Sequence, residues 1–200
     1  MAGSTPRIGV LALQGDVREH VETLKSIGIE PDEVRTTRQL ELVDALVIPG
    51  GESTVLDKLT RLFELAEPIK ARIAQGMPVL GTCAGLIMLA HDLSDATADQ
   101  QTFGGLDVTV RRNAFGAQVD SFETELDMPL VSSSPVAATF IRAPVIERVG
   151  KDVTVLARLG DGTVVGARSG NLVGISFHPE VSGETRIHEY FVGIVNDTVR

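Results

Sequence analysis

The chain has a single cysteine, Cys83, in the segment Gly81-Thr-Cys-Ala-Gly85. The pattern G-x-nucleophile-x-G is typical of a nucleophile elbow, the tight turn between a strand and a helix that exposes a reactive side chain. The two glycines give such a strained turn its clearance, and the amides that begin the next helix stabilise a thiolate or an oxyanion. The segment therefore predicts nucleophilic chemistry at Cys83. The alternative is a structural cysteine, because free cysteines are often buried.

A thiol nucleophile needs a base, and the chain offers four histidines. We expect His20 to be exposed or paired on a helix, and His188 to be a surface or half-buried residue of the last helix. His91 follows Cys83 by eight residues on the same predicted helix, and a separation of about 12 Å along the axis puts it out of reach of the sulfur. His178, in a loop after a predicted strand, is the predicted base.

The loop that carries His178 has the sequence Phe177-His-Pro-Glu180. Pro179 stiffens the path from His178 to Glu180, so the carboxylate can orient the imidazole and stabilise its cation. Sites in open α/β sheets lie beyond the carboxyl ends of strands, and Cys83 and His178 both follow predicted strands. The sequence therefore predicts a triad of nucleophile, base and orienting acid.

A metal site fits these residues less well. The close Cys/His pair that zinc sites show is missing from the candidate set, which is Cys83, His178, Glu180 and His188. The chain also has no G-x-G-x-x-G, and Gly50-Gly-Glu-Ser53 is too short for a phosphate-binding loop. Neither a metal nor a cofactor is expected.

The turn Gly50-Gly51 follows a predicted strand. Its flexible backbone can aim an N–H at a developing oxyanion. The alternative is that this pair of glycines forms only a turn.

These side chains need a scaffold that brings strand ends together, and the first 95 residues supply one. Short β-branched runs alternate there with helical stretches, as in parallel βαβ units. Asp16 and Glu19 resemble a capping box that opens the first helix, and Pro68 breaks or restarts a later one. The predicted strands are 8–13, 45–48 and 77–81, and the predicted helices are 17–27, 84–93 and one from Ser53 or Thr54 through Leu62.

The second half changes character after a polar surface loop at 94–102. Alternating segments with turn signals predict a more antiparallel arrangement, with strands at 108–110, 122–126, 153–159, 164–167 and 172–176 and a last helix at 182–199. The predicted fold class is a single α/β domain whose mixed, largely parallel, flavodoxin-like sheet is flanked by helices. We expect residues 1–6 to be a flexible N-terminus and residues 7–200 to form one domain. The alternative is that the β-rich half forms a second domain.

The composition limits the class of function. The 200 residues carry 18 Lys and Arg against 27 Asp and Glu, and this net charge of −9 argues against broad attraction to nucleic acid or an anionic membrane. With 43% hydrophobic residues the chain can bury a sizeable core. One cysteine cannot form an internal disulfide, and no run approaches the roughly 18 apolar residues of a membrane span. A soluble, cytoplasmic protein is expected.

Taken in order, Pro49-Gly-Gly51, the cysteine elbow and the late His-Pro-Glu resemble the class I, triad-type glutamine amidotransferases. Within that group the chain is similar, over nearly its whole length, to the glutaminase subunits of pyridoxal 5′-phosphate synthases. The similarity is carried by Leu11-Ala-Leu-Gln-Gly15, Glu19-His20, Pro49-Gly-Gly-Glu-Ser-Thr54, Arg112-Asn113, Phe115-Gly116, Val119-Asp-Ser-Phe-Glu123, Phe140-Ile-Arg-Ala-Pro144 and Ser176-Phe-His-Pro-Glu180.

The resemblance implies a glutaminase in which Cys83 attacks the glutamine side-chain amide, His178 relays the proton and Glu180 orients His178. The implied oxyanion donors are Gly50, Gly51 and Ala84. The implied glutamine-binding residues are Gly51, Glu52, Ser53, Arg112, Ile141 and Arg142.

Charge agrees with this transfer of roles, since an arginine can hold the α-carboxylate of glutamine and Glu52 can pair with its α-ammonium. The sequence does not decide which arginine meets which group. Without the resemblance, Arg112 would be an exposed strand charge and Arg142 half of an ordinary ion pair.

The resemblance also implies a partner. The ammonia would pass to a synthase (lyase) subunit that builds pyridoxal 5′-phosphate within a large hetero-oligomer. Gln14 would lie at the docking surface, rather than being only a polar residue at a helix entry. Two alternatives are the glutaminase subunit of another biosynthetic synthase, such as one for imidazole glycerol phosphate, and a flavodoxin-like redox sensor whose thiol is a switch.

Overall fold

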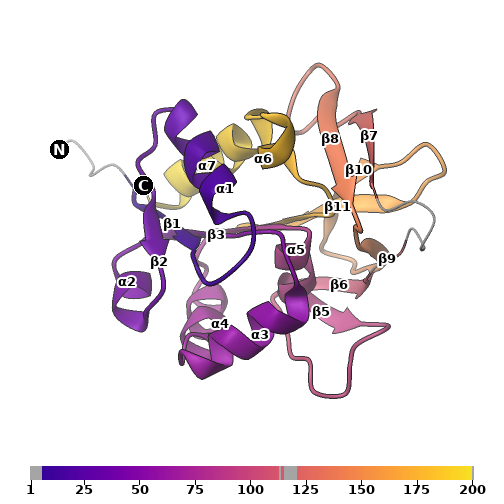
Figure 1. Ribbon diagram of the computed structural model, residues 1–200. Helices are drawn as coiled ribbons and strands as arrows, with labels where there is room; N and C mark the ends of the chain where they lie inside the picture. Colours follow the sequence, from indigo (N-terminus) through magenta and orange to yellow (C-terminus); the bar gives the residue numbers. More distant parts are fainter. Residues whose placement is uncertain (1–5, 113, 115–120, 200) are drawn as a thin grey trace.

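The computed structural model describes residues 6–112, 114 and 121–199. Within them, a ten-stranded sheet runs through the molecule with helices on both faces (Figure 1). Its strand order is β2-β1-β3-β4-β12-β11-β9-β6-β5, and β10 pairs with β11. A two-stranded sheet joins β7 and β8. The predicted fold class, a mixed α/β sheet flanked by helices, is confirmed.

The parallel part of the sheet supplies the strand ends at which the site lies. Apolar, β-branched runs suit strands that are covered on both faces. The pairing of Ile48 with Gly81, and of Ile175 with Thr82, brings the carboxyl ends of three adjacent strands level with one another. The parallel strands are β1 (Ile8–Leu11), β2 (Asp32–Val34), β3 (Ala45–Ile48), β4 (Val79–Thr82) and β12 (Leu172–Ile175).

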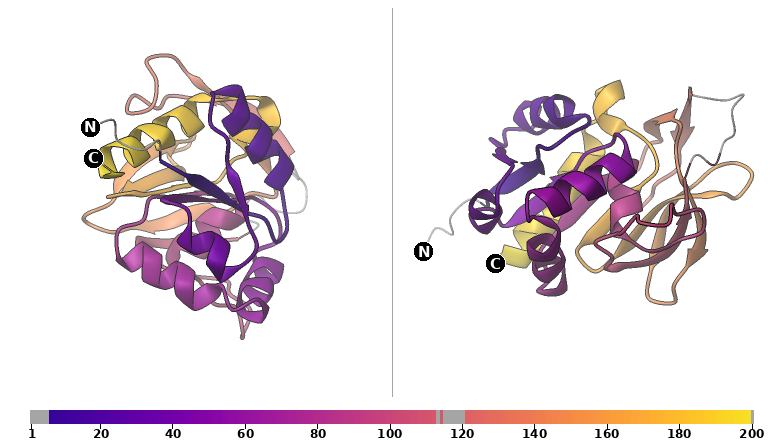
Figure 2. Two further views of the ribbon diagram at one scale, coloured as in Figure 1. Left: turned by 90° about the vertical axis from the view of Figure 1, so that its left-hand side faces the viewer. Right: turned by 60° about the horizontal axis from the view of Figure 1, so that its bottom comes forward.

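The helices cover the two faces of the sheet in separate sets (Figure 2). On one face, α1 (Val17–Ser26) and α7 (Arg186–Val199) bury Leu24 and Phe191 in one apolar core. On the other face, Leu56, Ile69 and Leu86 enter a second core from three helices. These are α3 (Ser53–Leu62), α4 (Ala66–Ala74) and α5 (Ala84–Leu89), while α2 (Thr37–Glu41) and α6 (Pro179–Ser182) are shorter.

The hairpin of β7 and β8 packs against the loop that follows β12. The Phe140 ring stacks on Phe122 with centroids 4.6 Å apart, and it lies 5.6 Å from the Phe177 ring. The backbone N–H of His178 donates to the Thr139 carbonyl at 2.8 Å. The hairpin therefore fixes the His178 loop. The remaining strands are β5 (Ala90–Leu93), β6 (Leu106–Arg111), β7 (Ser121–Leu126), β8 (Val136–Ile141), β9 (Val145–Val149), β10 (Thr154–Arg158) and β11 (Val164–Ser169).

Two of the predicted helices are wrong at one end. The helix expected over 84–93 stops at Leu89, and the chain continues as β5, because parallel pairing with β6 outweighs the helical spacing of the apolar residues. The helix expected over 182–199 begins only at Arg186, as α7. Residue Ser182 is instead the last residue of α6, which is capped by Gly183 with a left-handed φ of 70°. The first strand stops at Leu11 rather than at residue 13.

Several short elements are absent from the sequence prediction, namely β2, α2, α6, β8 and β9. Pro68 restarts a helix, since it lies in the first turn of α4. The expected N-terminal segment 1–6 lies, apart from Pro6, outside the described residues. In the described part of the chain, no helix has both the length and the apolar character needed to cross a bilayer.

Candidate active site

Cys83 occupies a strained turn between β4 and α5. Its φ of 48° and ψ of −100° lie outside the ordinary regions for a residue with a side chain. The turn has no room for a side chain at either neighbouring glycine. A Cβ on Gly85 would lie 2.1 Å from the Ile48 carbonyl oxygen, and a Cβ on Gly81 would lie 2.5 Å from the Gly85 backbone. The Cys83 N–H donates to the Ile175 carbonyl at 2.8 Å. The turn has the geometry of a nucleophile elbow.

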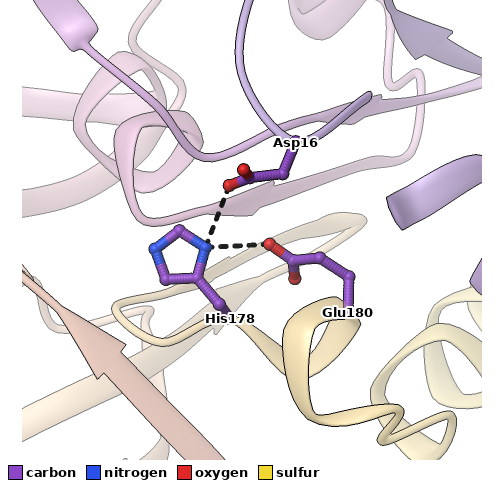
Figure 3. Close-up of side chains that lie close together, drawn as sticks. All are labelled: Asp16, His178 and Glu180. Atoms are coloured by element: carbon purple, nitrogen blue, oxygen red, sulfur yellow. Dashed lines mark hydrogen bonds and ion pairs between the residues drawn. The ribbon is translucent and has the colours of Figure 1, made fainter. Parts of the chain in front are cut away.

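His178 and Glu180 approach Cys83 from the end of the neighbouring strand. The Nδ1 atom of His178 lies 2.9 Å from Glu180 Oε1, and both side chains are almost fully buried (Figure 3). Cys83 lines the same cavity as His178 and is one of the groups that raise the pKa of His178. The structure thus brings together the three residues of the predicted triad, whose roles stay predictions.

The surroundings of His178 favour its cation. Burial alone would lower the pKa of His178, but hydrogen bonds to Asp16, Cys83 and Glu180 raise it to about 12. Burial raises the pKa of Glu180, and the hydrogen bond from His178 opposes that rise. An imidazolium beside the sulfur is the cation that a thiolate nucleophile needs.

Asp16 is a residue of the site that the sequence prediction missed. Its Oδ2 atom lies 3.2 Å from His178 Nδ1 (Figure 3). Asp16 was expected to cap the first helix, and it does occupy the N-cap of α1, but its side chain makes no capping hydrogen bond. The expected capping box is therefore wrong. Asp16 lies in the loop between β1 and α1, and its position beyond the carboxyl end of a parallel strand was the available signal.

The four residues considered above as a possible metal set, Cys83, His178, Glu180 and His188, are not grouped together among the described residues. Among the described residues, the group whose ligand atoms lie within 4.8 Å of one another is Asp16, His178 and Glu180. His188 makes its contact with His20 instead, with His20 Nδ1 and His188 Nε2 2.9 Å apart.

The other three histidines lie in surroundings that differ in part from their predictions. His20 is paired on its helix, as one of its two alternatives had it, but it is fully buried rather than exposed. His188 is fully buried rather than at the surface or half-buried, because α1 and α7 lie side by side on the same face of the sheet. His91 lies on β5 rather than on the helix of Cys83, and its exposed ring is paired with Asp92. The sequence alone could not show whether these three histidines are exposed or which element carries them, because both depend on how the elements pack together.

A cavity of about 270 Å³ lies next to the triad. Cys83 and His178 line it, together with the Asp16 side chain described above. The residues predicted to bind glutamine line the same cavity: Gly51, Glu52, Ser53, Arg112, Ile141 and Arg142. The structure therefore brings these residues around the nucleophile, and their roles in binding stay predictions.

Arg112 is held in place by the loop at 94–102. Its guanidinium donates to Gln100 Oε1 at 2.8 Å and to the Asp95 carbonyl at 2.8 Å. Gln100 in turn donates from Nε2 to Ser53 Oγ at 3.0 Å. Arg112 is mostly buried, not the exposed strand charge of the alternative. Gln100 is a second residue of the site that the sequence analysis did not identify, because it was expected to lie in a polar surface loop.

Arg142 and Glu52 enter the cavity from two other elements. Arg142 has a left-handed φ of 43° and lines the cavity, and it makes no ion pair with any described residue. Glu52 caps α3, because its carboxylate accepts from the Thr54 N–H at 3.2 Å. The predicted cap at Ser53 or Thr54 is therefore wrong by one or two residues.

The turn at Gly50 and Gly51 is packed against the loop after β1. The Asp16 N–H donates to the Gly50 carbonyl at 3.3 Å, and the Glu52 N–H donates to Gln14 Oε1 at 3.1 Å. A Cβ on Gly51 would lie 2.6 Å from Gln14 Oε1. The turn follows β3, which pairs with β4, and Ala84 begins α5 directly after Cys83. Of the motif residues quoted above, Asn113, Phe115, Gly116, Val119 and Asp120 lie outside the described residues.

A cysteine elbow and a buried His–Glu pair at adjacent strand ends of a mixed sheet define the architecture of the class I glutamine amidotransferases. The chain belongs to the SNO glutamine amidotransferase family, whose model matches residues 10–197. The family predicted from the sequence motifs is therefore confirmed.

Relatives and solved structures agree with this family. The chain is 56% identical to the "Pyridoxal 5'-phosphate synthase subunit PdxT" of Clavibacter sepedonicus, over 100% of this chain and 99% of the relative. It is 57% identical to the protein of the same name from Leifsonia xyli subsp. xyli, over the full length of both. A crystal structure described as a glutamine amidotransferase matches with a TM-score of 0.88 and 45% identity, covering 94% of this chain and 98% of the other. PurLQS from Thermotoga maritima shares the fold, with a TM-score of 0.69 at 18% identity over 97% and 99% of the two chains.

Proposed function

We propose that this chain hydrolyses L-glutamine to L-glutamate and ammonia through a thioester on Cys83, and that the ammonia passes to a synthase subunit that makes pyridoxal 5′-phosphate. The observation that carries the proposal is the single cavity shared by Cys83, His178 and the predicted glutamine-binding residues. The glutamine amidotransferase family supports the reaction, and the names of the relatives support the partner.

The first half-reaction forms the thioester. The thiolate of Cys83 donates an electron pair to the amide carbon, and the carbonyl π pair moves to oxygen. Backbone N–H groups at Ala84 and at Gly50-Gly51 hold the resulting oxyanion. His178 then gives its proton to the leaving nitrogen, the C–N bond breaks, and ammonia leaves a glutamyl thioester on the sulfur.

The second half-reaction releases glutamate. Neutral His178 takes a proton from water while the water oxygen bonds to the thioester carbon, and Glu180 stabilises the imidazolium that forms. The C–S bond breaks and the Cys83 thiolate returns. Arg112 and Arg142 are the cations available for the α-carboxylate of the substrate, and Glu52 is an anion available for its α-ammonium.

Direct transfer of ammonia explains why such an enzyme needs a partner, since ammonium formed in solution is not a nucleophile. Gln14 holds the Glu52 N–H through Oε1, while its buried Nε2 has no hydrogen-bond partner among the described residues. A docking subunit that reaches the loop after β1 would therefore act directly on the turn of Gly50-Gly51. We place Gln14 at the partner interface.

The proposal is tested by glutamate release from glutamine in the presence of a pyridoxal 5′-phosphate synthase subunit. We expect Cys83→Ala and His178→Asn each to reduce turnover by about 10³-fold or more, because each removes a reacting group. His91→Asn is the matched control and should keep full activity, since His91 is exposed on β5. Turnover retained in Cys83→Ala would disprove the thioester mechanism.

A further inference from the structure

Two buried histidines lie behind the triad, and the mechanism above does not use them. His20 comes from α1 and His188 from α7, and neither side chain is exposed. His20 Nδ1 lies 2.9 Å from His188 Nε2. On its other side, His20 Nε2 lies 3.1 Å from Thr82 Oγ1 and 3.5 Å from Glu180 Oε1. His20 thus stands between the residue that precedes the nucleophile and the acid of the triad.

Both rings are neutral near pH 7. Burial, with smaller effects from His188 and His178, lowers the pKa of His20 well below its usual value of 6.5. Burial also lowers the pKa of His188 to about 4. A neutral imidazole carries one N–H, so the four ring nitrogens of the pair share two protons. The contacts decide where these protons lie.

One arrangement of the two protons satisfies the surroundings best. If His188 carries its proton on Nε2, it donates to His20 Nδ1, and His20 presents its own N–H from Nε2 toward Thr82 and Glu180. His188 Nδ1, which has no partner among the described residues, is then a bare lone pair. The opposite arrangement leaves a buried N–H without an acceptor and turns a lone pair of His20 toward the Glu180 carboxylate. Both features are unfavourable in a buried site.

We propose that His20 is a positioning residue of the triad: its Nε2–H, fixed in place by His188, faces the Glu180 carboxylate and keeps it ionised and aligned with His178. The same N–H contacts Thr82, so His20 also connects the acid to the strand end that carries Cys83. The catalytic meaning of this inference rests on the proposed glutaminase function. The placement of the two protons does not.

Loss of this N–H has a defined electrostatic consequence. Besides His20, the charged or titratable groups around Glu180 are His178 and Asp16, with Cys83 beyond His178 and His188 beyond His20. Removing a donor from the carboxylate favours its protonated form, so the pKa of Glu180 rises. The acid limb of the pH profile of kcat/KM should then move to higher pH.

The proton positions can be measured without any assay of activity. The full chain, labelled with ¹⁵N only in its four histidines, gives ring nitrogen spectra that distinguish the two neutral tautomers and the cation. We expect His20 and His188 both to be neutral Nε2–H tautomers at pH 7, assigned by the spectra of His20→Gln and His188→Gln. A proton on Nδ1 of either ring, or a cation at pH 7, would overturn the proposal.

The functional half is tested with the enzyme activated by its synthase subunit. We expect His20→Leu to lower kcat about tenfold with little change in KM, and to move the acid limb of kcat/KM upward. In His20→Gln the amide N–H can replace Nε2–H, so the acid limb of kcat/KM should return to its wild-type pH. Val21→Ala trims the neighbouring, partly buried residue of α1 and is the matched control for packing.

If His20→Leu folds and the acid limb of its kcat/KM profile lies at the same pH as in the wild type, the positioning role is disproved. Should that variant not fold, an unchanged limb in His188→Leu, which removes only the partner that fixes the tautomer, would disprove it as well. Absence of glutamate release by the wild-type complex would instead count against the proposed function, and the tautomers would still be decided by the nitrogen spectra.

Discussion

Two carboxylates share one ring nitrogen of His178. Glu180 Oε1 lies 2.9 Å and Asp16 Oδ2 lies 3.2 Å from Nδ1, and the two acids differ in exposure. The Glu180 side chain is fully buried, whereas that of Asp16 is 34% exposed and faces the cavity. Packing therefore favours the prediction that Glu180, rather than Asp16, is the acid that orients the ring. Asp16 adds negative charge that favours the imidazolium.

Replacing Asp16 by asparagine keeps the shape of the side chain and removes its charge. We expect Asp16→Asn to lower the pKa of His178 from about 12, because the hydrogen bond from Asp16 is a main cause of its rise. The measurement is the pH dependence of the His178 ring carbon shifts in the free protein. Glu19→Gln is the control, since that carboxylate pairs with Arg18. An unchanged His178 titration in Asp16→Asn would contradict this account.

The triad can be predicted from sequence because each of its parts is local. The elbow around Cys83 and the His-Pro-Glu segment have short-range patterns with a mechanical reason. Asp16, His20 and Gln100 could not be assigned in this way, because their contacts join segments far apart in the chain. The local pattern at Asp16 even favoured another role, that of a helix cap.

The connection from β4 to α5 depends on close packing against β3. A side chain at Gly85 would collide with the Ile48 carbonyl oxygen, which belongs to the backbone of a central strand and cannot move aside. We expect Gly85→Ala to lower the free energy of unfolding by about 1–3 kcal/mol, as overpacking does, and to displace Cys83 and reduce activity. Urea unfolding and glutamate release together measure both effects.

Gly193 provides the matched control for that substitution. It lies inside α7, and a Cβ there would meet no atom within 4 Å. Gly193→Ala should therefore raise the free energy of unfolding by about 0.5–1 kcal/mol, through the better helix propensity of alanine, and leave activity unchanged. If Gly85→Ala behaved in the same way as Gly193→Ala, the close packing of the elbow would not matter.

The loop at 94–102 acts on the cavity through one side chain. Gln100 holds both Ser53 and Arg112, so its loss should loosen two predicted contacts to the substrate without touching the triad. We expect Gln100→Ala to raise KM for glutamine several-fold with little change in kcat. Gln101→Ala, at the exposed neighbouring position, should alter neither constant. A fall in kcat at constant KM would contradict the role assigned to Gln100.

The elements that hold the site were predictable to different degrees for physical reasons. β3 and β4 are continuous apolar runs that end in glycine-containing turns, and such runs indicate buried parallel strands. β5 has an equally apolar sequence leading into it, and only its pairing with β6 makes it a strand. β2 is three residues long and includes two acids, so it gives no strand pattern of its own.

At the scale of the whole molecule, the sheet separates two apolar cores, and the triad lies where the strand ends of both halves meet. The chain has a net charge of −9, yet its cavity is lined by Arg112 and Arg142 as well as by Asp16 and Glu52. An acidic protein can therefore present local positive charge to a small substrate with a carboxylate. Cys83 is also the only thiol in the sequence, so thiol labelling of the whole protein reports on this cavity alone.

The buried histidine pair also makes the stability of the whole molecule depend on pH. The pKa of His188 is about 4 in the folded chain and near 6.5 when unfolded, so the unfolded chain binds more protons between these values. Stability is thus fully present above pH 6.5 and is lost as the pH falls toward 4, by on the order of 3 kcal/mol for this residue. Glutamine at this position can still donate an N–H to His20 but does not titrate. Urea unfolding should therefore show a shallower loss of stability between pH 7 and 4.5 in His188→Gln than in the wild type, and equal slopes would show that His188 is not buried as a neutral group.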